Sequence, residues 1–346
     1  MTADSRTATA AGLPLRTLVV MPSWVGDCVM ALPVLEALAA SGRKVVAFAK
    51  PHLLPLLRLS DAVHDVVARS ADDATTIESL RAAGCDEAVV LPNSFRSAWF
   101  VRQAKIPWRW GYRGGFRAPL LSPAVPRPRG RRPQIEDYRE LLAALAVAEP
   151  ASWVPRLPRR DALVAQGRER LARARLDGPG PLIGLSPGAE WGTSKRWPWR
   201  RFADLARELR RQVPGGRQVI LVGPKEVWTG VRVHEESGKL HPVIGPDLDL
   251  AGLAALLACL DVMVTNDSGP MHLAAALGVP CVAFFGPTDP RRTAPAGDGH
   301  RVLSTNPWCS PCFSRRCPLI HHRCMRDIGV AATAEAVRAT LDARQR

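Results

Sequence analysis

The sequence has no apolar run approaching the roughly 20 residues that a helix needs to span a bilayer. Its first residues, Met1 to Gly12, are small and polar. They lack the basic segment followed by a long apolar segment that is typical of a secretory signal. We therefore expect a cytoplasmic protein in which residues 1–15 form a flexible N-terminus.

Acidic residues are scarce relative to basic ones. The chain has 47 Lys and Arg against 32 Asp and Glu, which gives a net charge of +15 at pH 7. Such a charge favours nucleic acid, an anionic membrane surface or an acidic substrate as a partner. Arginines gather at 127–132 and 156–160, both in Pro-rich stretches. A genome biased toward Arg codons is an alternative origin of this charge, and the sequence leaves both open.

The eight cysteines fall into two groups. Four are scattered in apolar surroundings, as expected of small core residues: Cys28, Cys85, Cys259 and Cys281. Four others are clustered with two histidines between them: Cys309, Cys312, Cys317 and Cys324, with His321 and His322. This density of ligands is typical of zinc or another thiophilic ion, but two clean Cys-x2-Cys pairs are missing. We expect reduced thiols in a loop, leave a structural metal open, and assign no metal site.

Short apolar runs alternate with helical stretches along the chain. Strands are expected at 16–21, 45–48, 63–68 and 88–91, and again at 182–185, 218–222, 261–264 and 279–285. This alternation predicts an α/β fold with parallel, doubly wound sheets, and 346 residues suit two domains. We predict two Rossmann-like domains facing a central cleft. The first, with a Pro-rich linker, covers 16–160, the second covers 161–330, and a C-terminal helix covers 331–346.

The most informative polar turn is Thr265–His272, which lies between an apolar run and a helical stretch. Free N–H groups at such a helix start attract an anion, usually phosphate. Asp267 stands where a carboxylate could accept bonds from ribose or sugar hydroxyls. The alternative is that Asp267 or Ser268 merely caps its own helix.

A second polar loop, 186–198, follows the first strand of the second half. Gly188 and Gly192 would let the backbone approach a ligand closely, and Lys195 could place a positive charge beside a leaving diphosphate. This is not a Walker A loop, because the Gly-Lys-Ser/Thr ending is missing. A basic surface loop whose tryptophans pack on the next helix is the alternative.

Further polar segments follow strand ends in the first half. Asp27 comes directly after the first strand, where a general base could take a proton from an attacking hydroxyl, although Asp also serves readily as a helix N-cap. The segments 91–97 and 111–114 contribute Asn93, Arg96 and Arg113. These side chains suit a sugar or a phosphate, but plain turn chemistry is open as well.

In chain order, these segments resemble the ADP-heptose:lipopolysaccharide heptosyltransferases, which form glycosyltransferase family 9. Four motifs carry the resemblance, at 22–27, 91–97, 187–198 and 265–272, and Gly286-Pro287-Thr288 continues it. The match is nearest to the heptosyltransferase II branch. It implies a GT-B fold and inverting transfer of L-glycero-D-manno-heptose from ADP-heptose to the first heptose of the lipopolysaccharide inner core, with no catalytic metal or other cofactor.

The resemblance also implies roles for individual residues. Asp27 would be the general base, and Lys195 would stabilise the departing ADP. The donor would be bound by Gly188, Lys195, Asp267, Ser268, Gly269 and His272, and the acceptor by Asn93, Arg96 and Arg113.

The partners implied are ADP-heptose, a heptosyl-Kdo2-lipid A acceptor and the cytoplasmic face of the inner membrane, contacted peripherally, but no nucleic acid. A GT-B transferase or an epimerase that uses another nucleotide sugar is the alternative, because no motif here distinguishes adenine from uracil. A zinc-stabilised nucleic-acid-binding protein would leave the polar turns at the strand ends unexplained.

Overall fold

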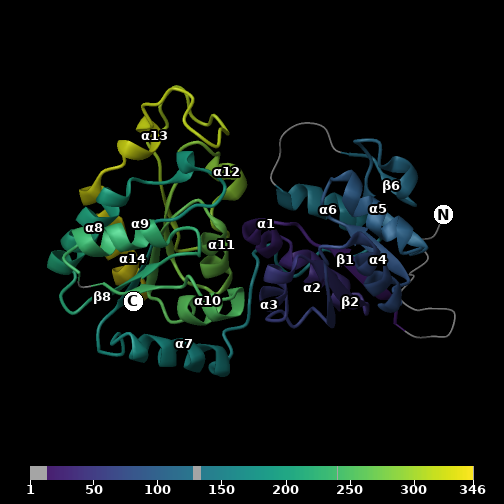
Figure 1. The fold of residues 1–346 in the computed structure, drawn as a ribbon, viewed down its shortest axis with the longest axis horizontal. Coiled ribbons are helices and arrows are strands. Elements are labelled where there is room, and N and C mark those ends of the chain that lie inside the picture. Colours follow the sequence, from purple (N-terminus) through teal and green to yellow (C-terminus); the bar gives the residue numbers. More distant parts are fainter. Residues whose placement is uncertain (1–13, 128–133, 240, 346) are drawn as a thin grey trace. The chain divides into compact units, whose positions relative to one another are not determined.

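The chain folds into two α/β units, divided between Pro158 and Arg159 (Figure 1). The computed structural model describes residues 14–127, 134–239 and 241–345. Residues 1–13 of the expected flexible N-terminus and most of the Arg-rich stretch 127–132 lie outside the described residues. Leu15, also expected to be flexible, accepts a hydrogen bond from the Lys44 N–H at 2.8 Å. Each unit holds a six-stranded sheet whose strands pair in parallel, with helices connecting them. The predicted α/β fold with two doubly wound sheets is confirmed.

The first sheet has the strand order β3-β2-β1-β4-β5-β6. Its strands are β1 (Arg16–Val20), β2 (Lys44–Ala49), β3 (Asp65–Ala68), β4 (Glu87–Val90), β5 (Trp108–Tyr112) and β6 (Ala124–Val125). Its helices are α1 (Val25–Met30), α2 (Leu32–Ala40), α3 (Leu54–Leu57), α4 (Asp73–Ala82), α5 (Phe95–Gln103) and α6 (Gln134–Ala144), with short 3-10 turns at Pro51–Leu53 and Ala118–Leu120.

The second sheet has the strand order β12-β11-β10-β7-β8-β9. Its strands are β7 (Leu182–Ser186), β8 (Arg217–Leu221), β9 (Val243–Ile244), β10 (Val262–Asn266), β11 (Cys281–Phe284) and β12 (Arg301–Leu303). Its helices are α7 (Asp161–Arg173), α8 (Trp199–Gln212), α9 (Val227–Glu236), α10 (Leu250–Leu257), α11 (Gly269–Ala276), α12 (Pro290–Thr293), α13 (Arg323–Arg326) and α14 (Val330–Gln345), with a 3-10 turn at Thr193–Lys195.

Burial explains which strands could be predicted from the apolar pattern of the sequence. The central strands β1, β4, β7 and β10 are buried almost throughout, so they appear as continuous apolar runs. The strands that the apolar pattern did not reveal are β5, β6, β9 and β12. Each of these lies at or next to a sheet edge, and most of their residues are partly exposed, so no apolar run marks them.

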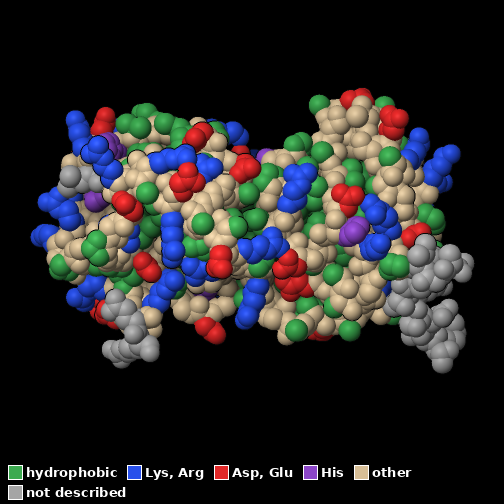
Figure 2. Space-filling model, turned by 90° about the horizontal axis from the view of Figure 1, so that it is seen from below, with side chains coloured by type: hydrophobic (Ala, Val, Ile, Leu, Met, Phe, Trp, Pro, Cys, Tyr) green, Lys and Arg blue, Asp and Glu red, His purple; other side chains and the backbone are tan. Residues whose placement is uncertain are grey.

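The C-terminal helix α14 belongs to the second unit. It packs against α8, and its residues Val337 and Leu341 lie in the same apolar core as β7 and β10. Among the described residues, no helix is both long and apolar enough to cross a membrane. On the face shown in Figure 2, Lys and Arg side chains are spread over both units, with Asp and Glu between them.

Candidate active site

Polar segments follow three neighbouring strands of the second sheet. β10 lies between β7 and β11 and pairs with both in parallel. The segments that come after these strands are 187–195, 267–268 and 285–288. The carboxyl ends of parallel strands meet at one edge of a sheet, so side chains far apart in the sequence come together here.

An ion pair between Lys195 and Asp267 forms the centre of this edge. The Lys195 Nζ lies 2.6 Å from the Asp267 Oδ2, and the two side chains are only 12% and 4% exposed. Thr288 donates its hydroxyl to the same carboxylate oxygen at 2.6 Å. The ammonium also lies 5.0 Å from the centre of the Trp191 ring. Because it is largely shielded from water, this ammonium attracts an anion more strongly than an exposed lysine does.

Helix α11 begins beside this ion pair without a side-chain cap. Its N-cap residue is Ser268, whose side chain makes no capping hydrogen bond. The alternative that Ser268 caps the helix with its hydroxyl is therefore wrong, and Asp267 pairs with Lys195 and Thr288 instead. Pro270 has no N–H, and the Met271 N–H donates to the Ser268 carbonyl at 3.2 Å. The helix start therefore offers an anion such as a diphosphate the Gly269 N–H and the positive end of the helix dipole.

His272 lies in the first turns of α11 and is buried. Burial lowers the pKa of its imidazole to about 4, against an opposing effect of Asp267, so the ring is neutral at pH 7. Its Nδ1 atom has no hydrogen-bond partner among the described residues. A buried polar atom without a partner is costly unless a ligand satisfies it, which makes His272 a candidate for contact with a bound molecule.

Gly188 is enclosed by Asn266 and Glu226. The Asn266 side-chain amide donates to the carbonyl oxygens of Pro187 at 2.9 Å and Gly188 at 3.0 Å, which ties the loop after β7 to β10. A Cβ atom on Gly188 would lie 2.0 Å from the Glu226 carboxyl group. A ligand that approaches the backbone at Gly188 therefore requires the flexible Glu226 side chain to move.

The turn that carries Lys195 packs against residues 309–324, which contain the four clustered cysteines and which we call the Cys-rich segment. The Ser194 N–H donates to the Arg315 carbonyl at 3.2 Å, and the His322 Nε2 lies 2.7 Å from the Ser194 carbonyl oxygen. A Cβ atom on Gly192 would lie 2.3 Å from the Arg315 carbonyl oxygen. The expectation that Gly192 opens space for a ligand is therefore wrong, because the backbone of the Cys-rich segment occupies that space.

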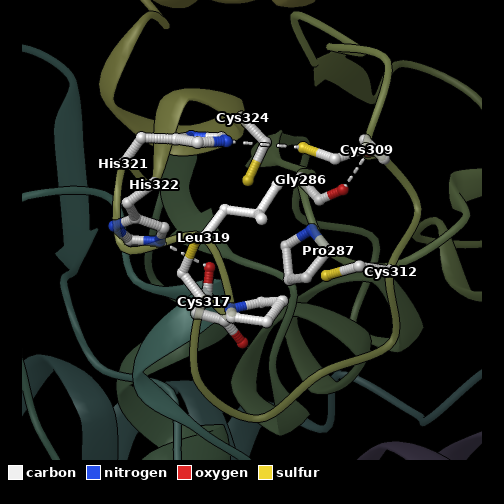
Figure 3. A pocket seen from close by; sticks show the side chains of 12 residues that line it. Gly286, Pro287, Cys309, Cys312, Cys317, Leu319, His321, His322 and Cys324 are labelled. Carbon is white, nitrogen blue, oxygen red and sulfur yellow. Dashed lines mark hydrogen bonds between the residues drawn. The ribbon is translucent and has the colours of Figure 1, made fainter.

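The clustered cysteines line one small cavity of about 20 Å³ (Figure 3). Its lining includes Cys309, Cys312, Cys317, Cys324, His321 and His322. All eight cysteines are free thiols, and the Cys309 Sγ lies 3.8 Å from the His321 Nε2. Burial, reinforced by the neighbouring cysteines, raises the pKa of the Cys324 thiol to about 11. Within the described part of the chain, no group of three or more His, Cys, Asp or Glu side chains is arranged to hold a metal ion.

In the first unit, a cavity of about 540 Å³ lies at the carboxyl edge of the sheet. It brings together three residues that the sequence singled out, Asp27, Asn93 and Arg96. Its other polar or charged lining residues are Ser23, Lys50, Arg69, Ser94, Ser97, Gln134 and Tyr138. A cavity of this size and polarity suits a sugar with anionic substituents.

Asp27 lies in the first turn of α1, but it is not the cap of that helix. The N-cap residue is Trp24, so the alternative in which Asp27 caps its own helix is wrong. Burial raises the pKa of the Tyr138 hydroxyl well above its ordinary value, and the Asp27 charge raises it further. Gln134 donates its side-chain amide to that hydroxyl at 2.5 Å. Asp27 thus contributes a carboxylate near the neutral hydroxyl of Tyr138, where it could accept a proton from a sugar hydroxyl.

Two guanidinium groups in this cavity share one aromatic ring. Arg69 and Arg96 lie 5.4 Å and 5.5 Å from the centre of the Phe100 ring. Burial and the charge of Arg96 lower the pKa of Arg69, partly offset by Asp73, with which Arg96 forms an ion pair at 2.5 Å. Two guanidinium groups at one ring favour an anionic group such as a phosphate or a carboxylate in this part of the cavity, although Asp73 already neutralises part of their charge.

Residues 74–322 match the model of glycosyltransferase family 9 (heptosyltransferase). Over 320 residues the chain is 33% identical to lipopolysaccharide heptosyltransferase 2 of Salmonella typhimurium, with 84% of this chain and 88% of that protein covered. The chain belongs to glycosyltransferase family 9. It is 33% identical over 309 residues to lipooligosaccharide heptosyltransferase 2 of Haemophilus influenzae, which covers 84% of this chain and 88% of that protein. The structure of Escherichia coli ADP-heptose lipopolysaccharide heptosyltransferase II matches with a TM-score of 0.81 and 29% identity, covering 96% of this chain and all of that one.

The predicted site residues of this family 9 enzyme fall into two groups, one in each unit. The second unit brings Lys195 and Asp267 into contact beside the start of α11, which carries Ser268, Gly269 and His272. The first unit brings Asp27, Asn93 and Arg96 to one cavity. Arg113 is exposed after β5 and is not among the lining residues, so its role in acceptor binding stays a prediction.

Several polar residues at these two sites were missed by the sequence analysis. In the first unit they are Lys50, Arg69, Gln134 and Tyr138, and in the second Glu226. Thr288 was noted only as part of a motif, with no contact to Asp267 expected. Lys50 and Arg69 are the first residues after β2 and β3, so the rule that ligands meet the carboxyl ends of strands could have found them. Gln134, Tyr138 and Glu226 lie on or beside helices and carry no such signal.

Proposed function

We propose that this family 9 glycosyltransferase moves L-glycero-D-manno-heptose from ADP-heptose to the first heptose of the lipopolysaccharide inner core. The heptosyltransferase 2 proteins to which it is similar support this choice of donor and acceptor. The observation that carries the proposal is the buried Lys195–Asp267 pair beside the uncapped start of α11. An ammonium and a helix N-terminus at one place suit the diphosphate of a nucleotide sugar.

On this proposal the donor is held by the second unit. The Gly269 N–H donates to the diphosphate at the positive end of the α11 dipole, and Lys195 balances the negative charge that grows on ADP as the glycosidic bond breaks. His272, neutral and lacking a partner at Nδ1, contributes a hydrogen bond to the bound donor. Asp267 orients the Lys195 ammonium through their 2.6 Å contact.

The acceptor is held in the cavity of the first unit. Asp27 takes the proton from the attacking hydroxyl of the acceptor heptose, and this hydroxyl displaces ADP with inversion at the anomeric carbon. Asn93 supplies hydrogen bonds to the sugar, while Arg96 and its neighbour Arg69 meet anionic substituents. Direct displacement of this kind needs a positioned base and a stabilised leaving group at the same moment.

We further propose that the enzyme works at the cytoplasmic face of the inner membrane, in peripheral contact with it. The proposed acceptor is anchored by lipid A, and a net charge of +15 favours an anionic surface.

Calorimetric titration with ADP, UDP and GDP in the presence of EDTA tests the donor half of the proposal. We expect ADP alone to bind with substantial affinity, and Lys195→Met to weaken that binding. Preference for UDP or GDP would replace ADP-heptose by another nucleotide sugar. The absence of binding to any of the three nucleotides would contradict a nucleotide-sugar donor altogether.

A further inference from the structure

The loop after β5 exposes an aromatic side chain at its tip. Phe116 is 96% exposed, and its neighbours Arg113, Gly114 and Gly115 are exposed as well. The φ angle of Phe116 is +60°, in the left-handed region that a bulky side chain rarely adopts. The chain thus exposes a large apolar ring to water on a strained backbone. This arrangement is unfavourable unless the ring is buried against a binding partner.

The base of this loop is fixed by Arg117. This arginine is 1% exposed, and its guanidinium donates to the carbonyl oxygens of Tyr112 at 2.7 Å and Ser94 at 3.2 Å, and also to that of Pro92. These bonds join the loop to the end of β5 and to the segment after β4. Phe116 is therefore carried by an anchored loop and not by a free tail.

Two other exposed aromatic residues lie at the same edge of the first sheet. Trp24 follows β1 and is 45% exposed, and Phe95 follows β4 and is 49% exposed. Because β1, β4 and β5 are neighbours in the sheet, Trp24, Phe95 and Phe116 mark three successive strand ends. We call these three residues the aromatic edge.

The segment that carries Phe95 and Phe116 has charge of one sign. Between Ala88 and Arg127 the sequence contains no aspartate or glutamate. Of its cations, Arg96 and the exposed Arg113 follow the carboxyl ends of β4 and β5. Lys50 and Arg69 follow β2 and β3 at the same edge, where Asp27 and Asp73, the partner of Arg96, are acidic side chains. A cationic surface with protruding aromatic rings is complementary to a layer of anionic headgroups over acyl chains, because the rings partition to the interface while the cations meet phosphates.

We propose that the aromatic edge docks on an anionic lipid bilayer, with the Phe116 ring entering its interfacial layer. The inference deepens the proposed function by naming the surface through which the enzyme meets the membrane. It depends on that function only through the lipid-linked acceptor. A protein partner would need a complementary acidic face, and sedimentation with protein-free vesicles separates the two kinds of partner.

Vesicle cosedimentation of the full-length enzyme tests the inference. The probes are vesicles of phosphatidylethanolamine with phosphatidylglycerol, and vesicles of phosphatidylcholine alone. Phe116→Asn removes the ring while keeping a residue that tolerates a left-handed backbone, so the variant is expected to fold. Trp228→Asn is the matched control, because Trp228 is 65% exposed on α9 of the second unit.

We expect the wild type to bind the anionic vesicles and not the phosphatidylcholine vesicles. Phe116→Asn should weaken binding about tenfold, Phe116→Trp should preserve it, and Trp228→Asn should leave it unchanged. Equal binding by the wild type and Phe116→Asn, or no binding to anionic vesicles, would overturn the inference.

A second readout separates this inference from the proposed function. With a deacylated acceptor in solution, Phe116→Asn should transfer heptose as fast as the wild type. With the acceptor embedded in anionic vesicles it should be several-fold slower. Failure of the wild type to use either acceptor would overturn the proposed function. The vesicle binding of the variants would still show whether the aromatic edge docks on the bilayer.

Discussion

At the scale of single residues, the second unit concentrates its chemistry in the contact between Lys195 and Asp267. The two groups are nearly buried, so their attraction is far less screened than that of a surface pair. Lys225 offers the contrast. Its Nζ lies 2.7 Å from Glu190, but its side chain is 80% exposed.

Replacement of Lys195 should therefore affect turnover, and replacement of Lys225 should not. We expect Lys195→Met to lower kcat by about 10²–10³, because a contact with the leaving group strengthens in the transition state. Lys225→Met should stay within about twofold of the wild type, since exposed ion pairs contribute little. Steady-state kinetics with ADP-heptose measures both, and an unchanged kcat for Lys195→Met would remove this residue from the catalytic machinery.

Asp27 gives a separate prediction for the first unit. Asp27→Asn keeps the shape of the side chain but removes the base, so kcat should fall by about 10²–10⁴ while the Kd for ADP stays unchanged. Glu78→Gln, which removes an exposed carboxylate on α4, is the matched control and should leave kcat and the Kd for ADP unchanged. Steady-state kinetics measures kcat and calorimetry measures the Kd for ADP on the same preparations of both variants. A fully active Asp27→Asn enzyme would refute the assignment of the base.

His272 predicts a dependence of stability on pH. Its pKa is lowered from 6.5 to about 4 in the folded chain, so the unfolded chain binds more protons between these two values. The contribution of neutral His272 to the free energy of unfolding is complete above about pH 6.5. It is lost as the pH falls toward 4. Between about pH 7.5 and 5 the wild type should lose roughly 2 kcal/mol of unfolding free energy through this group.

The variant His272→Asn should not show the decrease in unfolding free energy that His272 causes between pH 7.5 and 5. His241, whose pKa burial also lowers to about 4, keeps its own contribution in the variant. Urea unfolding at the two pH values gives the difference directly. If wild type and variant lose the same free energy, His272 is not held neutral by the fold.

At the scale of elements, the turn from Gly192 to Trp197 connects the site to the Cys-rich segment. Arg315 and His322 bond to Ser194, and the Trp197 indole N–H donates to the Ile328 carbonyl at 3.1 Å. From the sequence we expect reduced thiols in a loop here. The structure shows in addition that this segment supports the turn on which Lys195 stands.

Gly192→Ala tests this support. The backbone of Gly192 is extended, so its need for glycine is steric, and a Cβ would meet the Arg315 carbonyl oxygen at 2.3 Å. We expect kcat to fall tenfold or more as Lys195 is displaced, since small misplacements of catalytic groups cost that much. Gly178→Ala is the control, because its Cβ would find only an ordinary contact at 3.9 Å. Equal kinetics for the two variants would contradict the account.

The sequence predicted what depends on local pattern. Buried strands such as β1 and β10 appear as apolar runs, and Asp27 and Asp267 follow them within a few residues, so the strand-end rule located both. It could not predict that Gly192 faces Arg315 or that Glu226 covers Gly188, because these contacts join distant segments through side-chain packing. Tyr138 was missed for the same reason, since its neighbour Asp27 lies on a different helix.

At the scale of the whole molecule, the chain joins two sheets of the same parallel type, each with its polar residues at the carboxyl edge. From the alternating pattern we expect two domains, with the boundary after residue 160 at the end of a Pro-rich linker, and the two units divide between Pro158 and Arg159. The net charge of +15 belongs to this scale too, because it acts on partners and not on the fold. An anionic, lipid-linked acceptor would account for it.

The most direct test of the central claim is transfer of heptose by the full-length enzyme from ADP-heptose to defined acceptors, followed by mass spectrometry. The two acceptors are heptosyl-Kdo2-lipid A and Kdo2-lipid A, which lacks the first heptose. We predict that a single heptose is added to the former and none to the latter. Transfer to Kdo2-lipid A alone, or transfer only from a different nucleotide sugar, would contradict the proposed function.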